Sequence, residues 1–242
     1  MKKQLKKLLQ KKFRREEQQF IVEGVKGVGE LLASSYSTVT VYIEEGREQD
    51  DAIAPIIASA YKKGVPVERL SVKDANQMSS TDTFPGVMAV AKIPLGKLPE
   101  GGPVLYLDGL KDPGNVGTLI RTADWFGVAG VILSEHCVDL YNPKLVRSTM
   151  GSLFHFPVHV DVEYQAFHQL KDAGYQCIGL SLDGEPLQTL PQGNVCLVLG
   201  SESHGLSKEV DSLVDTRYTI PGKGQAESLN VAIAGGIVMS QL

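Results

Sequence analysis

Short blocks of apolar and polar residues alternate along residues 1–92 and predict a small α/β domain. Runs rich in β-branched and aromatic residues predict its strands, which we place at residues 20–22, 39–43, 65–70 and 87–93. Helical spacing predicts two helices, at residues 25–34 and 52–63. Residues 93–103 (IPLGKLPEGGP) are rich in proline and glycine and lack an apolar period, so we interpret them as a linker.

Residues 104–242 alternate more regularly between predicted strands and helices. The strands are expected at residues 104–107, 130–133, 156–160, 176–180, 195–199 and 217–220. The helices are expected at residues 116–126, 142–150, 163–173, 207–213 and 228–240. Strands such as VCLVL at 195–199 are apolar at every position, which indicates burial on both faces. We therefore expect an α/β fold whose C-terminal part is a mostly parallel sheet flanked by helices.

The N-terminal segment differs in charge from the rest of the chain. The 242 residues have a formal net charge of −4, yet residues 1–15 contain eight Lys and Arg residues and no acidic one. Apolar residues at helical spacing within this segment predict an amphipathic helix. Such a helix could contact RNA, lie on an anionic membrane surface or simply be solvated. The candidates for RNA contact are Lys11, Lys12, Arg14 and Arg15.

The composition excludes several classes of protein. Hydrophobic residues make up 43% and charged residues 21% of the chain, which is typical of a globular protein rather than a disordered one. No apolar run approaches the ~20 residues that span a bilayer, and the N-terminus lacks a secretory signal, so we expect a cytoplasmic protein. Cys137, Cys177 and Cys196 form no C-x-x-C pair. We expect buried thiols, with neither a disulfide framework nor a metal site.

Three segments after the linker are rich in Gly, Asn, Ser and Glu, and each follows a predicted strand, where ligands bind in open α/β sheets. In the first, residues 107–117, Asn115 is expected to cap the following helix. Arg121 lies about a turn and a half further along, where its guanidinium can hold a phosphate. In the alternative interpretation, Asn115 is only a cap and Arg121 is only a surface ion-pair partner.

In the second segment, residues 199–207, an apolar strand runs directly into Gly-Ser-Glu. Small residues at such a point let a flat ligand approach the backbone closely, although an ordinary tight turn has the same composition. Glu202 is the acidic residue of this loop. His204 could act as a general base, but a histidine in a glycine-flanked loop is more often an exposed polar residue.

The third segment, residues 220–230, leads into a helix rich in Ala and Gly, which allows very close packing. Ser228 and Asn230 both lie near its start, and both residue types cap helices. Because one helix N-terminus needs one capping side chain, the other residue is free for a ligand.

Together, the three segments resemble the SpoU-type (TrmH-like) branch of the SPOUT superfamily, the RNA 2′-O-ribose methyltransferases. The matching motifs are N-x-G-x-x-x-R at 115–121, L-G-S-E-x-x-G-L-S at 199–207 and I-P…S-L-N-V-A at 220–232. Residues 148–154 also look like the family. Ser203-His204 departs from the family pattern, which usually has Gly first, and puts the detailed shape of that loop in question. Residues 1–92 resemble, less specifically, the small substrate-binding domain that precedes many of these enzymes.

The resemblance implies a deep trefoil knot in residues 104–242, S-adenosylmethionine as cofactor and a homodimer built on the C-terminal domain. The family's catalytic positions correspond to Asn115, Arg121, Glu202, Ser228 and Asn230. The expected cofactor contacts are Gly200, Ile220 and Leu229, mostly through the backbone, with Leu199 and Pro221 lining the same pocket.

The resemblance therefore implies methylation of a ribose 2′-hydroxyl, with 23S-type ribosomal RNA as the first expectation for the substrate and transfer RNA as the alternative. The methyl sulfonium is already electrophilic, so the enzyme chiefly aligns the reactants and helps the proton to leave. The counterpart of Arg121 is often assigned as the base, but a guanidinium stays protonated in proteins. We favour the hypothesis that Arg121 holds the phosphate and stabilises alkoxide charge. Rival interpretations are a non-catalytic RNA-binding or assembly factor and a dinucleotide-dependent oxidoreductase, although the G-x-G-x-x-G loop of the latter is missing after every predicted strand.

Overall fold

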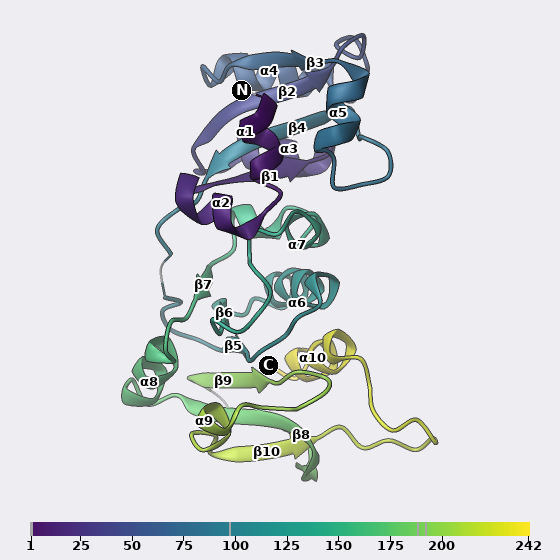
Figure 1. The fold of residues 1–242 in the computed structure, drawn as a ribbon. Coiled ribbons are helices and arrows are strands. Elements are labelled where there is room, and N and C mark those ends of the chain that lie inside the picture. Colours follow the sequence, from purple (N-terminus) through teal and green to yellow (C-terminus); the bar gives the residue numbers. More distant parts are fainter. Residues whose placement is uncertain (1, 97, 188, 192) are drawn as a thin grey trace. The chain divides into compact units, whose positions relative to one another are not determined.

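The computed structural model describes residues 2–96, 98–187, 189–191 and 193–242, with side chains from residue 5 onward. Two compact units make up the chain (Figure 1). The first comprises residues 1–95 and 141–155, and the second comprises residues 96–140 and 156–242. The first crossing between the units lies within the expected linker. The helix expected at residues 142–150, which we had assigned to the C-terminal part, packs within the first unit.

The first unit is built on a four-stranded sheet with the order β1-β4-β2-β3. Its strands are β1 (Gln19–Glu23), β2 (Thr38–Glu44), β3 (Val67–Leu70) and β4 (Val87–Lys92). Strand β4 is antiparallel to both β1 and β2, whereas β2 and β3 are parallel. All four strands predicted for this region are confirmed.

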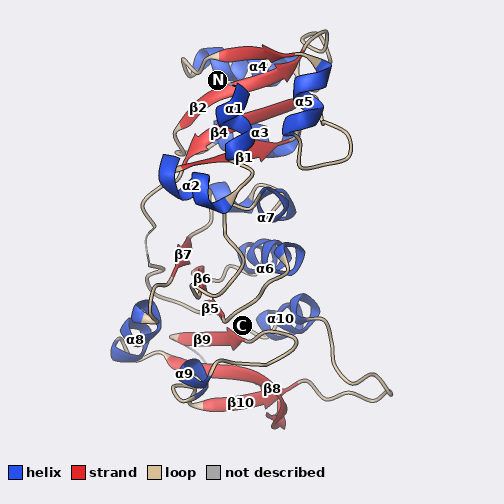
Figure 2. Cartoon of the chain, in the orientation of Figure 1, coloured by secondary structure: helices blue, strands red, loops and turns tan. Residues whose placement is uncertain are grey.

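Six α-helices and a 3-10 turn complete the described part of the first unit (Figure 2). They are α1 (Lys2–Lys7), α2 (Lys11–Glu17), α3 (Val25–Ala33), α4 (Ala54–Lys62), α5 (Val72–Met78), α7 (Pro143–Ser148) and η1 (Ser152–Phe154). The sequence predicted α3, α4 and α7 but not α5. Helix α5 is short and is capped by Ser71, whose side chain accepts a hydrogen bond from the Asp74 N–H.

The basic N-terminal segment forms two short helices rather than the single helix that we expected. Leu5 and Leu8 are buried in a cluster with residues of α5. Arg14 is also buried, and its Nη1 donates to the carbonyl oxygen of Leu8 at 2.8 Å, where the helix is interrupted. The expectation that Arg14 contacts RNA is therefore corrected, because its guanidinium is buried and is hydrogen-bonded to a backbone carbonyl of its own segment. The other three RNA candidates, Lys11, Lys12 and Arg15, are exposed.

The second unit is built on a six-stranded sheet with the order β10-β8-β9-β5-β6-β7, in which every pair of neighbours is parallel. Its strands are β5 (Val104–Leu107), β6 (Gly130–Leu133), β7 (Val158–Val160), β8 (Gln176–Pro186), β9 (Val195–Leu199) and β10 (Thr216–Thr219). Its helices are α6 (Pro113–Trp125), α8 (Gln165–Asp172), α9 (Lys208–Asp211) and α10 (Val231–Met239). The predicted α/β fold with a mostly parallel sheet is confirmed, and β8 runs further than expected.

Helices cover both faces of this sheet. Side chains of β5, β8 and β9 form a core cluster with residues of α8 and α9 on one face. On the other face, α10 packs closely on α6, as its small residues predicted. A Cβ atom on Gly235 would lie 2.5 Å from the side chain of Leu119 and 2.9 Å from that of Leu199, so a larger residue would require both leucine side chains to move.

A buried polar contact lies inside the α8 face of the core. The Tyr106 hydroxyl donates to the Asp161 carboxylate at 3.0 Å, and the same carboxylate accepts the N–H groups of Ala166 and Phe167 at 2.8 and 3.2 Å. Burial raises the pKa of Tyr106 far above its ordinary value, so the hydroxyl stays protonated and remains a donor.

The three cysteines are free and buried, as predicted. No helix among the residues that the structure describes combines the length and the apolar character needed to cross a membrane.

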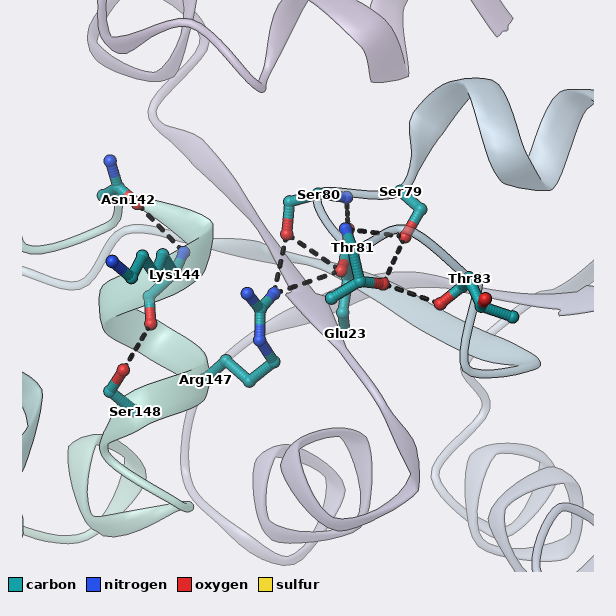
Figure 3. A network of polar contacts seen from close by, with 9 residues as sticks. All are labelled: Glu23, Ser79, Ser80, Thr81, Thr83, Asn142, Lys144, Arg147 and Ser148. Atoms are coloured by element: carbon teal, nitrogen blue, oxygen red, sulfur yellow. Dashed lines mark hydrogen bonds and ion pairs between the residues drawn. The ribbon is translucent and has the colours of Figure 1, made fainter. Parts of the chain in front are cut away.

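A polar network ties α7 to the end of β1 within the first unit (Figure 3). The Glu23 side chain is 1% exposed. Its carboxylate accepts hydrogen bonds from the Ser80 N–H at 2.7 Å and from the Ser80 hydroxyl at 2.9 Å. Arg147 Nη1 lies 3.4 Å from the same carboxylate and donates to the Ser80 hydroxyl at 2.7 Å. One buried carboxylate thus connects β1, the loop after α5 and α7.

Glu23→Ala is expected to lower the free energy of unfolding by about 1–3 kcal/mol, because it leaves the Ser80 N–H without its acceptor and removes the ion pair with Arg147. Urea unfolding followed by circular dichroism measures this loss. Glu16→Ala is the control, since its 3.8 Å ion pair with Lys12 is exposed and is expected to contribute about 0–1 kcal/mol. Equal losses in the two variants would contradict the role given to Glu23.

Candidate active site

The five residues predicted as catalytic come from three segments of the second unit. Asn115 lies in the first turn of α6 and Arg121 further along that helix. Glu202 lies in the loop between β9 and α9, while Ser228 and Asn230 precede α10. Parallel strands end at the same edge of a sheet, which is why the segments that follow β5 and β9 meet.

The structure joins three of these residues in one hydrogen-bonded chain. Asn115 Nδ2 donates to Glu202 Oε1 at 2.5 Å. Asn230 Nδ2 in turn donates to Asn115 Oδ1 at 3.0 Å. Both groups of the Asn115 amide are thus used, one as donor and one as acceptor. The chain connects segments that are 87 and 115 residues apart in the sequence.

Asn115 does not cap its helix, so this expectation was wrong. Helix α6 begins at Pro113, and Asp112 is the capping residue, with its Oδ1 accepting the Asn115 N–H at 2.8 Å. Proline at the first helical position and Asp immediately before it are a favourable helix start. The cap at Asp112 leaves the Asn115 side chain available for Glu202 and Asn230.

Asn230, not Ser228, caps α10. Its Oδ1 accepts the N–H groups of Ala232 and Ile233 at 2.9 and 3.4 Å. Ser228 is exposed and has no hydrogen-bond partner among the residues that the structure describes. The expectation that one of the two residues caps the helix while the other is left over therefore agrees with the geometry.

Arg121 and His204 stand outside the hydrogen-bonded chain. Arg121 is exposed and, within the described part of the protein, its guanidinium has no hydrogen-bond or ion-pair partner. His204 is exposed as well, and its Nδ1 lies 2.7 Å from the Ser203 hydroxyl. A long, solvated guanidinium on the same helix as Asn115 is suited to an anionic ligand that arrives from solution.

The residues predicted to contact a cofactor differ in how far their side chains are exposed to a ligand. Leu199 is buried, with its side chain against α10, so only its backbone is available to a ligand. A Cβ atom on Gly200 would lie 2.3 Å from the Gly205 carbonyl carbon, because the loop folds back on itself there. Ile220 is half-buried, whereas Pro221 and Leu229 are exposed. These properties fit contacts made mainly by backbone groups and by apolar surface.

The Cys137 thiol lies at this edge of the sheet and is buried. Cys137 Sγ donates to the Leu107 carbonyl oxygen at 3.1 Å, and burial raises the pKa of the thiol above its usual value. A protonated, buried thiol is a poor nucleophile. The candidate chemistry therefore rests on the amide, carboxylate, hydroxyl and guanidinium groups.

Two acidic residues of this region were not singled out from the sequence. Asp112 caps α6, and Asp108 is buried at the end of β5. Asp108 follows four consecutive buried residues of β5, and an acidic residue directly after a wholly apolar strand is a signal that could have identified it.

Comparison with known families agrees with this arrangement. Residues 102–240 match the SpoU rRNA Methylase family, and residues 2–89 match the MRM3-like substrate binding domain. The chain belongs to the SpoU rRNA methylase family. The predicted resemblance is thereby confirmed, and the two matches agree with an N-terminal substrate-binding domain followed by the methylase domain.

Relatives of this SpoU-family chain match it over nearly its whole length. It is 34% identical to the Bacillus subtilis protein named 23S rRNA (guanosine(2553)-2′-O)-methyltransferase RlmP, over 98% of this chain and 93% of that protein. The AdoMet-bound rRNA methyltransferase from Sinorhizobium meliloti has a TM-score of 0.87 at 29% identity, covering 99% of this chain and 92% of the other. AviRb from Streptomyces viridochromogenes, also in complex with AdoMet, has a TM-score of 0.88 at 25% identity, with 99% and 95% covered.

Asn230→Ala is expected to reduce the stability of the protein by about 1 kcal/mol, because it removes the acceptor for the first N–H groups of α10. Ser228→Ala, two residues away, is expected to change it by less than about 0.5 kcal/mol, since the hydroxyl caps nothing. Denaturant midpoints of the two variants provide the comparison. A larger loss for Ser228→Ala than for Asn230→Ala would show that the assignment of the cap is wrong.

Proposed function

We propose that this protein transfers a methyl group from S-adenosylmethionine to a ribose 2′-hydroxyl of 23S-type ribosomal RNA. The observation that carries the proposal is the hydrogen-bonded chain Glu202–Asn115–Asn230, which joins the three segments that carry the family motifs. Membership of the SpoU rRNA methylase family and the activity named for the Bacillus subtilis relative support it.

The residues at this edge of the sheet suit S-adenosylmethionine. Gly200, Ile220 and Leu229 would hold the cofactor, chiefly through their backbones, and Leu199 and Pro221 would line the same pocket. The exposed side chain of Leu229, 47% accessible immediately before α10, offers apolar surface to an adenine ring. When bound, the cofactor supplies an electrophilic methyl group on its sulfonium.

The side chains of this protein would then position the RNA and stabilise charge. Asn115 orients the Glu202 carboxylate, whose second oxygen has no partner among the described residues and can accept a hydrogen bond from a ligand. Arg121 holds the phosphate beside the target ribose and stabilises the negative charge that develops on the 2′-oxygen. The Ser228 hydroxyl is available as a further contact. In the first unit, Lys11, Lys12 and Arg15 attract the RNA backbone through their positive charge.

Methyl transfer is tested with labelled S-adenosylmethionine and two substrates, unmodified 23S ribosomal RNA and transfer RNA. We expect label in a 2′-O-methylnucleotide of the ribosomal RNA, and a loss of at least about 100-fold in rate for Arg121→Ala. Lys171→Ala, on α8, is the control for removal of a positive charge in the same unit. Label in transfer RNA alone would overturn the substrate, and RNA binding without transfer would make the protein a binding factor.

The pH dependence of Arg121→Lys separates two roles for this residue. A clamp lowers the single-turnover rate by the same factor at every pH, because lysine keeps the charge but loses the bidentate grip. A general base would instead shift the kinetic pKa, since the two side chains titrate differently. We expect the uniform loss, measured as the ratio of variant to wild-type rates across the pH range.

We also propose a homodimer built on α6 and α10 of the second unit. Large apolar side chains are exposed at the C-terminal end of α6, at Trp125 (85%) and the following Phe126 (41%), and on the adjoining α10, at Ile233 (55%) and Ile237 (38%). Ile233 and Ile237 are four residues apart on α10, so they lie on one face of it. An apolar patch of this kind favours burial against a second copy. Its position next to Leu229 and Asn230 would bring the second copy close to the site.

Ile233→Glu is expected to convert the dimer into a monomer, because a charge would be buried in the contact. Light scattering after size-exclusion chromatography measures the mass. Leu182→Glu is the matched control, since Leu182 is 74% exposed on β8, away from both helices, and its change is expected to leave the dimer intact. A monomeric wild-type protein, or a dimer that survives Ile233→Glu, would contradict the proposal.

The trefoil knot and the cytoplasmic location belong to the same proposal. The knot rests on membership of the SpoU rRNA methylase family, and α10, which follows the outermost strand β10, packs on α6. A ribosomal RNA substrate would place the protein in the cytoplasm. The proposed domains are residues 1–92 for RNA binding and residues 104–242 for methyl transfer.

A further inference from the structure

Asp108 holds both ends of the loop that carries Glu202. It directly follows β5 and is 2% exposed. Its backbone N–H donates to the Leu199 carbonyl oxygen at 2.8 Å, at the start of the loop. Its carboxylate Oδ2 accepts the Ser207 N–H at 2.6 Å, at the end of the loop. The residues between these two contacts include Gly200 and Glu202.

Between these two ends, the loop is held by its own hydrogen bonds. Ser201 and Gly205 exchange N–H···O bonds of 2.9 Å in both directions, and the His204 N–H donates to the Ser201 hydroxyl at 3.2 Å. The close approach of Gly200 to Gly205 leaves no space for a side chain. The loop is therefore bonded internally, and its backbone is also hydrogen-bonded where it joins the sheet.

The far end of the loop is also the start of α9. Ser207 caps this short helix, with its hydroxyl accepting the Val210 N–H at 3.3 Å. Val210 is fully buried in the core of the sheet. The Asp108 carboxylate thus fixes the point at which the loop is anchored to the core.

Asp108 is not fully satisfied by these contacts. Its Oδ1 is buried and has no hydrogen-bond partner among the described residues. Asp161, which follows β7 as Asp108 follows β5, is equally buried, yet both of its oxygens accept hydrogen bonds. A buried carboxylate oxygen without a partner reduces stability. The two carboxylates therefore differ in their hydrogen bonding. Both oxygens of Asp161 are paired within the core. Asp108 has one oxygen bonded to the loop at Ser207 and one without a partner among the described residues.

We propose that Asp108 is a positioning residue of the methyltransferase site, acting through the loop from Leu199 to Ser207. Its carboxylate places Gly200 for the cofactor and Glu202 for Asn115, and it contacts neither substrate nor cofactor itself. This inference rests on the proposed function. Asp108→Asn keeps a side-chain oxygen that can accept the Ser207 N–H and removes the negative charge of the carboxylate. Asp108→Ala removes the acceptor altogether.

The test uses the full-length protein and compares Asp108→Ala, Asp108→Asn and the control Asp161→Asn. Calorimetry gives the Kd for S-adenosylmethionine, and thermal unfolding gives the Tm. We expect Asp108→Ala to weaken binding at least about tenfold, and Asp108→Asn to remain within about threefold of wild type without a lower Tm. Asp161→Asn is expected to lower the Tm but to leave the Kd unchanged. A purely structural role for Asp108 would instead make its variants follow the pattern of Asp161.

Several results would overturn the inference. A folded Asp108→Ala protein with wild-type affinity, or an Asp108→Asn protein as impaired as Asp108→Ala, would show that the carboxylate does not act by positioning the loop. If Asp108→Ala fails to fold, Asp108→Ser, which is too short to reach the Ser207 N–H, provides the same comparison. A wild-type protein that binds no S-adenosylmethionine and transfers no methyl group would refute the proposed function instead.

Discussion

The parallel pairing of β5 with β9 is the constraint on which the candidate site depends. In register, Leu107 lies opposite Leu199, and the next residue, Asp108, continues the pairing through its bond to the Leu199 carbonyl oxygen. Two segments that are far apart in the sequence therefore leave the sheet at the same edge. The start of α6 and the loop of Glu202 meet there because parallel strands share their carboxyl ends.

Backbone groups that leave a sheet or begin a helix need hydrogen-bond partners, and here side chains at that edge supply them. Asp112 accepts the Asn115 N–H at the start of α6, and Asp108 accepts the Ser207 N–H. Asn230 accepts the Ala232 N–H at the start of α10. Asn230 performs two tasks at once, because its amide oxygen caps the helix while its nitrogen donates to Asn115. An aspartate could cap but not donate, which explains why an amide suits this position.

In the first unit, too, a side chain at the end of a strand accepts a backbone N–H, but there it also binds a helix from a distant part of the chain. Glu23 ends β1 and accepts the Ser80 N–H, so a strand end is again secured by a buried carboxylate. Here the carboxylate also receives Arg147 from α7, a helix that lies far along the chain. Together with the ring contacts of Phe20 with Tyr141 and of Tyr36 with Phe154, this contact joins the segment 141–155 to a unit otherwise made of residues 1–95. Sequence order alone would assign it to the methylase part.

The sequence by itself determined the α/β class, the strands of both sheets, the parallel character of the second sheet and the motifs of the site, since these depend on local periodicity and spacing. It also predicted a helix at residues 142–150, where the structure has α7 capped by Asn142, whose Oδ1 accepts the Lys144 N–H. Only the tertiary structure showed that Asp112 rather than Asn115 caps α6. It also showed that Arg14 is buried and that Asn115 is hydrogen-bonded to Glu202. The cap of α6 and the bond of Arg14 to Leu8 span only three and six residues, so several local arrangements compete there and packing selects one. The bond of Asn115 to Glu202 joins residues 87 apart, which no local pattern specifies.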